Sequence, residues 1–177
     1  MAIFGESPYN ELDYQMLQNG SVCLYCSRTY LEEDVDWLVR NGYLIYRLDC
    51  TTWTSEAAMH ESLQDVFSFP EYYGKNLNAL WDCMIDLLVP ERGGVAVVLG
   101  SYDVFTGGPG SSRASGERTA AEAILGIMAS ASRLMLLTGK RLITLVQSDD
   151  PRIQFSGLGS VSAQWNRREW LNSDPGL

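Results

Sequence analysis

Apolar residues gather in four short runs along the chain, and helical patterns separate these runs. Each run is rich in β-branched or aromatic residues, as is typical of buried β-strands. We therefore predict strands at 21–27, 43–49, 94–99 and 141–147. Between and after them, apolar residues recur three and four positions apart, which predicts helices from about Thr29 to Asn41, 54–68, about Lys75 to Val89 and about Arg118 to Thr138.

The expected helix ends carry the usual signals. Thr29 is predicted to cap the first helix and Asn41-Gly42 to stop it, while Thr54 or Ser55 caps the second. Pro70 and Pro90 follow the second and third helices. Strands that alternate with helices predict an α/β fold with a mainly parallel sheet of about four strands.

The chain of 177 residues has the length of one domain. We predict a single domain over 1–177, with a core at 43–148, a strand–helix extension at 1–42 and a C-terminal extension at 149–177. The first strand, helix and second strand form a βαβ unit, which predicts parallel strands and a right-handed crossover. A short helical turn is expected around Glu11 to Leu17, and Trp165 and Trp170 are expected to pack the tail.

The charge balance is acidic, with a net charge of −9 and an isoelectric point of about 4.5. Such a surface repels phosphate backbones and suits a basic protein partner, although acidity also simply favours solubility. The first fifteen residues lack the basic start of a secretory signal, and apolar runs such as Leu134 to Leu137 and Val95 to Leu99 are too short to span a bilayer. These features predict a cytoplasmic protein that binds neither nucleic acid nor membrane.

Candidate catalytic groups are few. Cys23 and Cys26 have the CxxC spacing of zinc or redox sites, but no second CxxC follows, so buried packing is the favoured interpretation. His60 lies in a predicted helix without a recognisable nucleophile, and we expect it to pack or cap. The Gly/Ser-rich segment 105–117 lacks the lysine of a phosphate-binding loop and is expected to be a surface loop. We predict no enzyme activity, metal or cofactor.

The stretch FPEYYGKNLNALWDCMIDLL, residues 69–88, has a composition unlike the rest of the chain. On a helix beginning near Asn76, one arc faces the core and contains Leu77, Leu80, Met84, Leu87 and Leu88. Asn78, Asp82 and Asp86 form a stripe on the opposite side, with Trp81 at the border. A merely solvated polar face is the simpler interpretation, but aromatic residues beside a carboxylate are typical of a binding hot spot.

At these residues the sequence resembles the barstar family, the intracellular inhibitors of barnase-like ribonucleases. PEYYGKNLNALWDC is similar to the family's signature, and the similarity runs without gaps from His60 to Met84. The resemblance implies a three-layer barstar-like fold with larger N- and C-terminal extensions. It also implies that Asp82 enters the phosphate site of a ribonuclease, with Tyr72, Gly74, Asn76 and Trp81 lining the same interface.

Two positions depart from the family pattern. The family's first interface aspartate is Asn78 here, and its late acid has no counterpart in SRLMLL, residues 132–137. Asp86, one turn beyond Asp82, is expected to compensate. It stays open whether these changes alter partner choice.

The leading hypothesis is a bacterial immunity protein of toxin–antitoxin type, which inhibits a basic microbial ribonuclease in a 1:1 complex. The alternative is a non-inhibitory interaction module that binds a different basic partner. A small enzyme using a cysteine or His60 is a third, weaker hypothesis.

Overall fold

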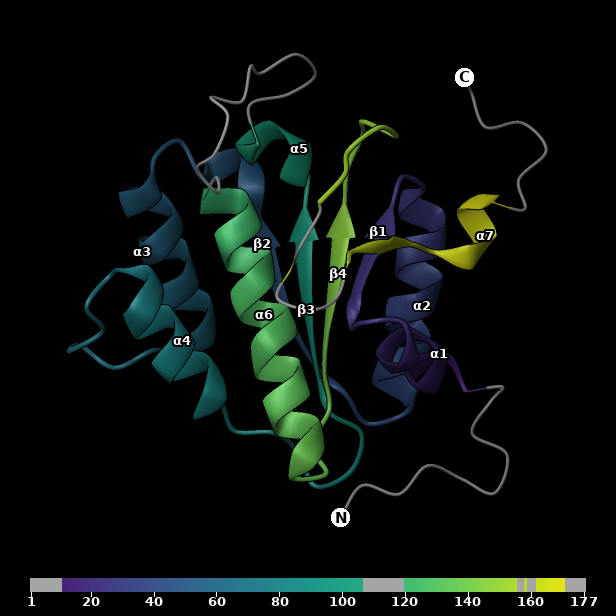
Figure 1. Ribbon diagram of the computed structural model, residues 1–177, viewed down its shortest axis with the longest axis horizontal. Helices are drawn as coiled ribbons and strands as arrows, with labels where there is room; N and C mark the ends of the chain where they lie inside the picture. The colour runs from purple at the N-terminus through teal and green to yellow at the C-terminus, as the bar shows by residue number, and fades with distance from the viewer. Residues whose placement is uncertain (1–10, 107–119, 156–157, 159–161, 171–177) are drawn as a thin grey trace.

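The computed structural model describes residues 11–106, 120–155, 158 and 162–170. Its centre is a five-stranded sheet in which every pair of neighbouring strands is parallel, in the order β2-β3-β4-β1-β5 (Figure 1). The strands are β1 (Val22–Tyr25), β2 (Leu44–Asp49), β3 (Val95–Gly100), β4 (Leu142–Gln147) and β5 (Gln164–Trp165). The four predicted strands and the α/β class are confirmed, and β5 is an addition.

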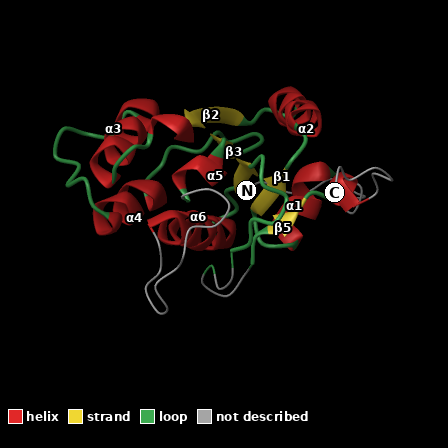
Figure 2. Cartoon of the chain, turned by 90° about the horizontal axis from the view of Figure 1, so that it is seen from above, coloured by secondary structure: helices red, strands yellow, loops and turns green. Residues whose placement is uncertain are grey.

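Helices cover both faces of the sheet (Figure 2). The elements are α1 (Leu12–Gln18), α2 (Arg28–Arg40), a 3₁₀ turn η2 (Cys50–Thr52), α3 (Glu56–Phe67), α4 (Leu77–Ile85), α5 (Tyr102–Phe105), α6 (Ala120–Leu137) and α7 (Arg167–Trp170). Helices α3, α4 and α6 share a core with one face, and α1 and α2 share a second core with the other. The arrangement is therefore three-layered.

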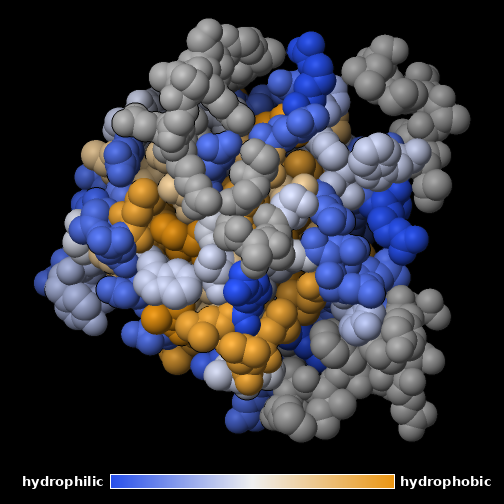
Figure 3. All heavy atoms as spheres, in the orientation of Figure 1, coloured by the Kyte–Doolittle hydropathy of each residue, from blue (hydrophilic) through white to orange (hydrophobic). Residues whose placement is uncertain are grey.

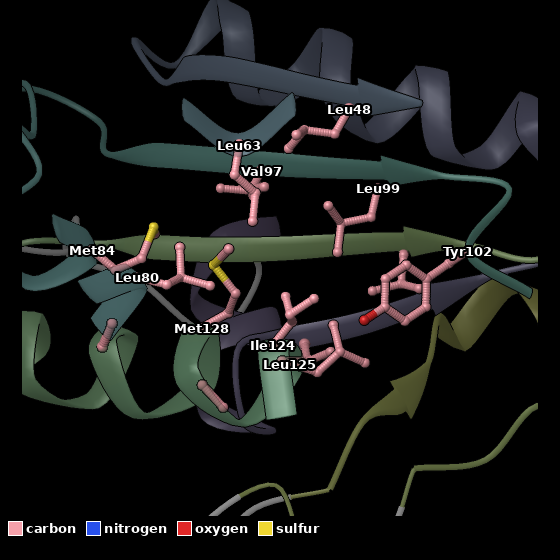
Figure 4. Close-up of a cluster of buried hydrophobic side chains, with 14 of the residues drawn as sticks. Leu48, Leu63, Leu80, Met84, Val97, Leu99, Tyr102, Ile124, Leu125 and Met128 are labelled. Atoms are coloured by element: carbon pink, nitrogen blue, oxygen red, sulfur yellow. The ribbon is translucent and has the colours of Figure 1, made fainter. Parts of the chain in front are cut away.

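The larger core lies between the sheet and α3, α4 and α6. Strand residues alternate in direction, so Leu48, Val97 and Leu99 face this layer while Ala96 and Val98 face the other. Figure 4 shows the facing side chains from the helices, which are fully buried and include Leu63, Leu80, Met84, Ile124, Leu125 and Met128. This packing positions α4, whose outer face carries the predicted site.

Helix α6 is the one described helix long and apolar enough, by length and composition, to cross a membrane. Glu122 and Arg133 interrupt its sequence, so the uninterrupted apolar runs remain as short as the sequence predicts. Half of the helix is buried inside the fold, and its inner residues, such as Ile124 and Met128, pack against the sheet. It is therefore the core helix of a folded domain, and no membrane protein is indicated.

One predicted helix cap is wrong, and two other predicted helix ends are confirmed. Ser27, not Thr29, caps α2, because its hydroxyl accepts a hydrogen bond from the Tyr30 amide at 3.3 Å. Ser55 caps α3 in the same way, through the Ala58 amide. The predicted stop at Asn41-Gly42 is confirmed, with Gly42 at a φ of 84°. A short helix, α5, precedes the predicted Gly/Ser loop, of which residues 107–117 lie outside the described part of the chain.

The segments before and after 43–148 take part in the same sheet. Strand β1 lies between β4 and β5, so the predicted unit of β1, α2 and β2 has parallel strands that are not neighbours. Asp13 of α1 is buried, accepts a hydrogen bond from Tyr43 at 2.6 Å and pairs with Arg141 at 2.7 Å. Buried polar contacts thus tie α1 to the residues that directly precede β2 and β4.

The C-terminal segment is attached through α2. One carboxylate oxygen of Glu169 accepts hydrogen bonds from the amides of Cys26 (3.1 Å) and Ser27 (2.9 Å), just before that helix. Arg168 pairs with Glu33 and Asp34. The prediction that two tryptophans pack the tail is confirmed for Trp165, which packs against the larger core. It is wrong for Trp170, which is exposed.

Candidate functional site

Buried aromatic rings anchor the loop that leads into α4. Phe67, at the end of α3, stacks on Phe69 at 5.2 Å between ring centroids, and Phe69 lies 5.1 Å from the ring of Tyr73. The Tyr73 amide donates to the Pro70 carbonyl at 2.9 Å, which closes the turn. The loop is therefore held at both ends by side chains that belong to the core.

A buried hydrogen bond between His60 and Tyr73 reinforces this anchor. His60 Nδ1 and the Tyr73 hydroxyl are 2.6 Å apart, and both side chains are buried. Burial lowers the pKa of His60, so its neutral imidazole can accept a hydrogen bond from the Tyr73 hydroxyl. Burial also raises the pKa of Tyr73, which keeps its hydroxyl protonated as the donor. The expectation that His60 packs is confirmed, and its role is to hold the loop.

The backbone before α4 is fixed by a cap. Asn76 accepts a hydrogen bond from the Ala79 amide at 3.0 Å and donates to the Gly74 carbonyl at 3.0 Å. A Cβ on Gly74 would lie 3.0 Å from Asn76 Nδ2, closer than ordinary contacts allow without adjustment. Lys75 between them has a φ of 45° and pairs with Glu61 of α3 at 3.4 Å. Gly74 and Asn76 therefore shape the loop together.

The residues predicted to bind a partner lie on α4 and the loop before it, and all of them except Trp81 are exposed. Asn78, Asp82 and Asp86 are exposed along the outer side of α4, as the stripe predicted. Trp81 is half-buried at the border and packs against the core, as expected. Tyr72 is 87% exposed on the loop. We name this set the α4 surface: Tyr72, Gly74, Asn76, Asn78, Trp81, Asp82 and Asp86.

The inner arc of α4 needs two corrections. Leu80, Met84 and Leu87 are buried as predicted, and Leu77 is partly buried. The helix ends at Ile85 instead of continuing to Val89, with Asp86 as its C-cap. Because the helical periodicity stops there, Leu88 does not join the core arc and is 86% exposed.

The α4 surface is electronegative. Burial raises the pKa of the Cys83 thiol, and the charges of Asp82 and Asp86 raise it further. The field at the middle of α4 therefore disfavours additional negative charge and favours a cation. Between Tyr72 and Asp86 the sequence has one cationic residue, Lys75, which pairs with Glu61 of α3.

The alternative chemical sites are weak in the described part of the chain. No group of three His, Cys, Asp or Glu side chains there could hold a metal ion. The four thiols are unpaired with one another, and burial raises the pKa of Cys23 to about 12, so this thiol is protonated at neutral pH. Cys23 is buried, as the packing interpretation of CLYC predicts, whereas Cys26 is only half-buried.

An open groove of about 520 Å³ lies at the carboxyl ends of β2 and β3, away from α4. Its two arginines already have acidic partners. Arg47 pairs with Glu32 at 2.6 Å and Arg28 with Asp149 at 3.3 Å. The groove is thus a poor match for an anionic ligand.

Sequence reasoning missed the contrast between the two tyrosines of the loop. Both residues lie on the same loop, but Tyr72 is 87% exposed and Tyr73 is buried. His60, the partner of Tyr73, lies thirteen residues earlier on a neighbouring helix. No periodic sequence pattern links a helix to a loop, so this contact could not be predicted from the sequence.

Comparison with known proteins finds similar sequences over the part of the chain that contains α4. The sequence model of the family described as Barstar (barnase inhibitor) matches residues 43–147, more than half of the chain. A Bacillus subtilis (strain 168) protein, "Putative ribonuclease inhibitor YrdF", is 58% identical over 26 residues. That stretch covers 15% of this chain and 29% of the relative, so the chain matches less than a third of that protein's length.

Among solved structures, the chain is similar to one in "Structure of Drosophila ORC bound to AT-rich DNA and Cdc6". The likeness has a TM-score of 0.45 and 14% identity, over 92% of this chain and 56% of that chain. It is too weak to indicate a common fold or function.

The fold and the site define an α/β domain that presents an acidic, aromatic helix-and-loop surface. The chain belongs to the barstar (barnase inhibitor) family. The resemblance seen in the sequence is thereby confirmed, and members of this family are inhibitors and not enzymes.

Proposed function

We propose that this chain is an immunity protein that inhibits a basic, barnase-like bacterial ribonuclease by inserting its α4 surface into the enzyme's active site. The observation that carries the proposal is the position of Asp82. This carboxylate is exposed at the centre of the outer stripe, one residue from Trp81, on a helix whose start is fixed by a capped and anchored loop. A rigid surface of this kind binds with little loss of conformational freedom.

The mechanism is occlusion. A ribonuclease that cleaves RNA must hold phosphate with cationic side chains, and a carboxylate can take the same place as a charge-assisted acceptor. Asp82 would pair with those cations while Trp81 and Tyr72 exclude water around the pair, which strengthens the attraction. The inhibitor itself needs no reaction, cofactor or metal.

The remaining residues have supporting roles. Gly74 and Asn76 would set the loop backbone against the enzyme, and Asn78 would contribute an amide where relatives have an acid. Asp86, exposed one turn beyond Asp82, would supply a second negative charge. The resulting complex would contain one copy of each protein.

Charge and location fit the same role. A net charge of −9 would steer a basic enzyme towards the inhibitor and speed their encounter. We propose that the protein acts in the bacterial cytoplasm, where it would neutralise a toxic ribonuclease before export, as in toxin–antitoxin pairs.

A second function is favoured by the two departures from the family pattern. Asn78 and the segment 132–137 lack acids that the resemblance leads one to expect. A non-inhibitory module that binds another basic protein through the same surface would tolerate both changes.

The test is inhibition of barnase, the enzyme in the family's description, by the chain and its Asp82→Ala variant. Removing one partner of a buried charge pair weakens interfaces by about 2–5 kcal/mol, a range that already includes barnase–barstar measurements. The unfolding free energy should change by no more than about 0.5 kcal/mol, because Asp82 is exposed.

Asp36→Ala is the matched control. It removes the same charge from an exposed position on α2, across the sheet from α4. If the chain inhibits barnase and Asp82→Ala inhibits equally well while folded, the insertion mechanism is wrong. If the chain does not inhibit barnase at all, the interaction module takes its place.

A further inference from the structure

Exposed leucines gather at one end of the helical layer. Leu88 is 86% exposed and Leu137 84% exposed, and Leu134 is 43% exposed. Figure 3 shows apolar atoms spread over the lower ends of α4 and α6, in the orientation of Figure 1. Single exposed leucines are ordinary, but a contiguous apolar surface marks a contact site. We name these three residues the leucine patch.

The patch follows from the local structure of the two helices. The helical spacing of the sequence predicts that Leu88 faces the core. Helix α4 ends at Ile85, however, so Leu88 lies outside the helix and is exposed. Helix α6 is apolar on average although only half of it is buried, and it carries two charged residues, Glu122 and Arg133. Its inner face carries Met128 and Met135, and the outer face of its last turns carries Leu134 and Leu137.

The patch borders the α4 surface. Helices α4 and α6 pack directly against each other. Leu88 lies two residues beyond Asp86, the last residue of the outward stripe, so the charged and apolar surfaces meet at the end of α4.

The size of the patch argues against a self-contained interface. Three leucines expose on the order of a few hundred Å², within the range of a single surface patch. A stable complex buries about 800 Å² on each partner. The leucine patch is thus too small to hold a dimer by itself, but it could enlarge a neighbouring interface.

We propose that the ribonuclease bound by the α4 surface also covers the leucine patch, with an apolar surface beside its basic active site. This inference rests on the proposed function and specifies the surface of the partner, which would have a cationic active site with an apolar region next to it. The contact would bury apolar area and would keep water from the Asp86 end of the charged stripe.

The experiment compares Leu88→Ser, Leu137→Ser and the double variant with the unmodified full chain as inhibitors of barnase. Each substitution should weaken inhibition by about tenfold and the pair by about a hundredfold, because each removes a leucine buried in the complex. Val104→Ser is the control, since Val104 is 54% exposed on α5, at the opposite end of the sheet in Figure 1. The control should inhibit like the unmodified chain.

Thermal unfolding and sedimentation of the same proteins separate the outcomes. If Asp82→Ala loses inhibition but the double leucine variant keeps it, this inference is overturned and the proposed function stands. If the unmodified chain fails to inhibit barnase, both fall. If the unmodified chain sediments as a dimer that the leucine variants dissociate, and their inhibition is unchanged, the patch is a self-contact and the inference is likewise overturned.

Discussion

Tyr72 and Tyr73 are neighbours in sequence with opposite surroundings. The first is 87% exposed, and the second is 4% exposed with its hydroxyl on His60. The alternation has a simple cause, since the turn closed by the Pro70 carbonyl directs Tyr73 towards α3 and leaves Tyr72 outside. One tyrosine thus belongs to the core and the other to the proposed interface.

Tyr73→Phe should destabilise the protein although the ring is retained. The change leaves the Nδ1 atom of buried His60 without its 2.6 Å partner, which costs about 1–3 kcal/mol. Denaturant unfolding measures the difference. Tyr72→Phe is the control and should stay within about 0.5 kcal/mol, because its hydroxyl is at the surface. Equal stability of the two variants would contradict the anchoring role of Tyr73.

The protein should lose stability as the pH falls below about 6.5, partly through His60. Burial lowers the pKa of His60 in the folded state, so the unfolded chain binds the proton more readily. Its contribution is fully present above the unfolded pKa, near 6.5, and declines as the pH falls towards the folded pKa. Thermal unfolding between pH 7.5 and 5.5 measures this slope.

His60→Phe supplies the comparison for the pH experiment. That variant cannot titrate at position 60, so its unfolding temperature should depend less on pH across this window, even though it is less stable overall. A slope equal to that of the unmodified protein would assign the effect to other groups.

At the scale of elements, the start of α4 is the most constrained junction of the site. Asn76 links the Ala79 amide to the Gly74 carbonyl, so one side chain both begins the helix and fixes the loop. Asn76→Ala should cost about 1 kcal/mol, as for other helix caps. Barnase inhibition should weaken as well, because the loop loses the same contact.

Asn76→Asp separates these two effects. Aspartate also caps helices well, but it cannot donate to the Gly74 carbonyl. It should therefore preserve most of the stability measured by thermal unfolding while still loosening the loop. If Asn76→Ala unfolds like the unmodified protein, the cap is unimportant.

At the scale of the whole molecule, the family match and the sheet have different boundaries. Residues 43–147 provide β2, β3 and β4, whereas β1 and both helices of the second layer come from earlier residues. Those helices cover buried side chains such as Ala96, Val98, Ile143 and Leu145. The N-terminal segment therefore completes a core that the matched region begins.

A chain restricted to residues 43–147 should not behave as a stable monomer. It would expose the apolar face now covered by α1 and α2, along with the β4 edge that pairs with β1. We expect aggregation in size-exclusion chromatography and no cooperative thermal transition, in contrast to the full chain. A monomeric, cooperatively melting 43–147 would instead support an independent core with dispensable extensions.

Much of this protein could be predicted from its sequence, because the relevant patterns are local. Runs such as Val95 to Leu99 favour strands wherever they occur, and the four-residue spacing of Asn78, Asp82 and Asp86 places them on one side of any helix. The composition of residues 70–83 likewise indicated the family. The α/β class, the four strands and the exposed stripe depended on nothing distant in the chain.

Only the tertiary structure decided features that depend on contacts between distant segments. The order of the strands places β1 beside β4, because pairing joins residues more than a hundred positions apart. Tyr73 is held in its inward position by the hydrogen bond between its hydroxyl and His60 of another helix. Leu88 is exposed because α4 ends at Ile85. Glu169, near the other end of the chain, accepts a hydrogen bond from the Ser27 amide at the start of α2. Local periodicity carries no information about such partners, since their free energy depends on which surfaces the whole fold brings together.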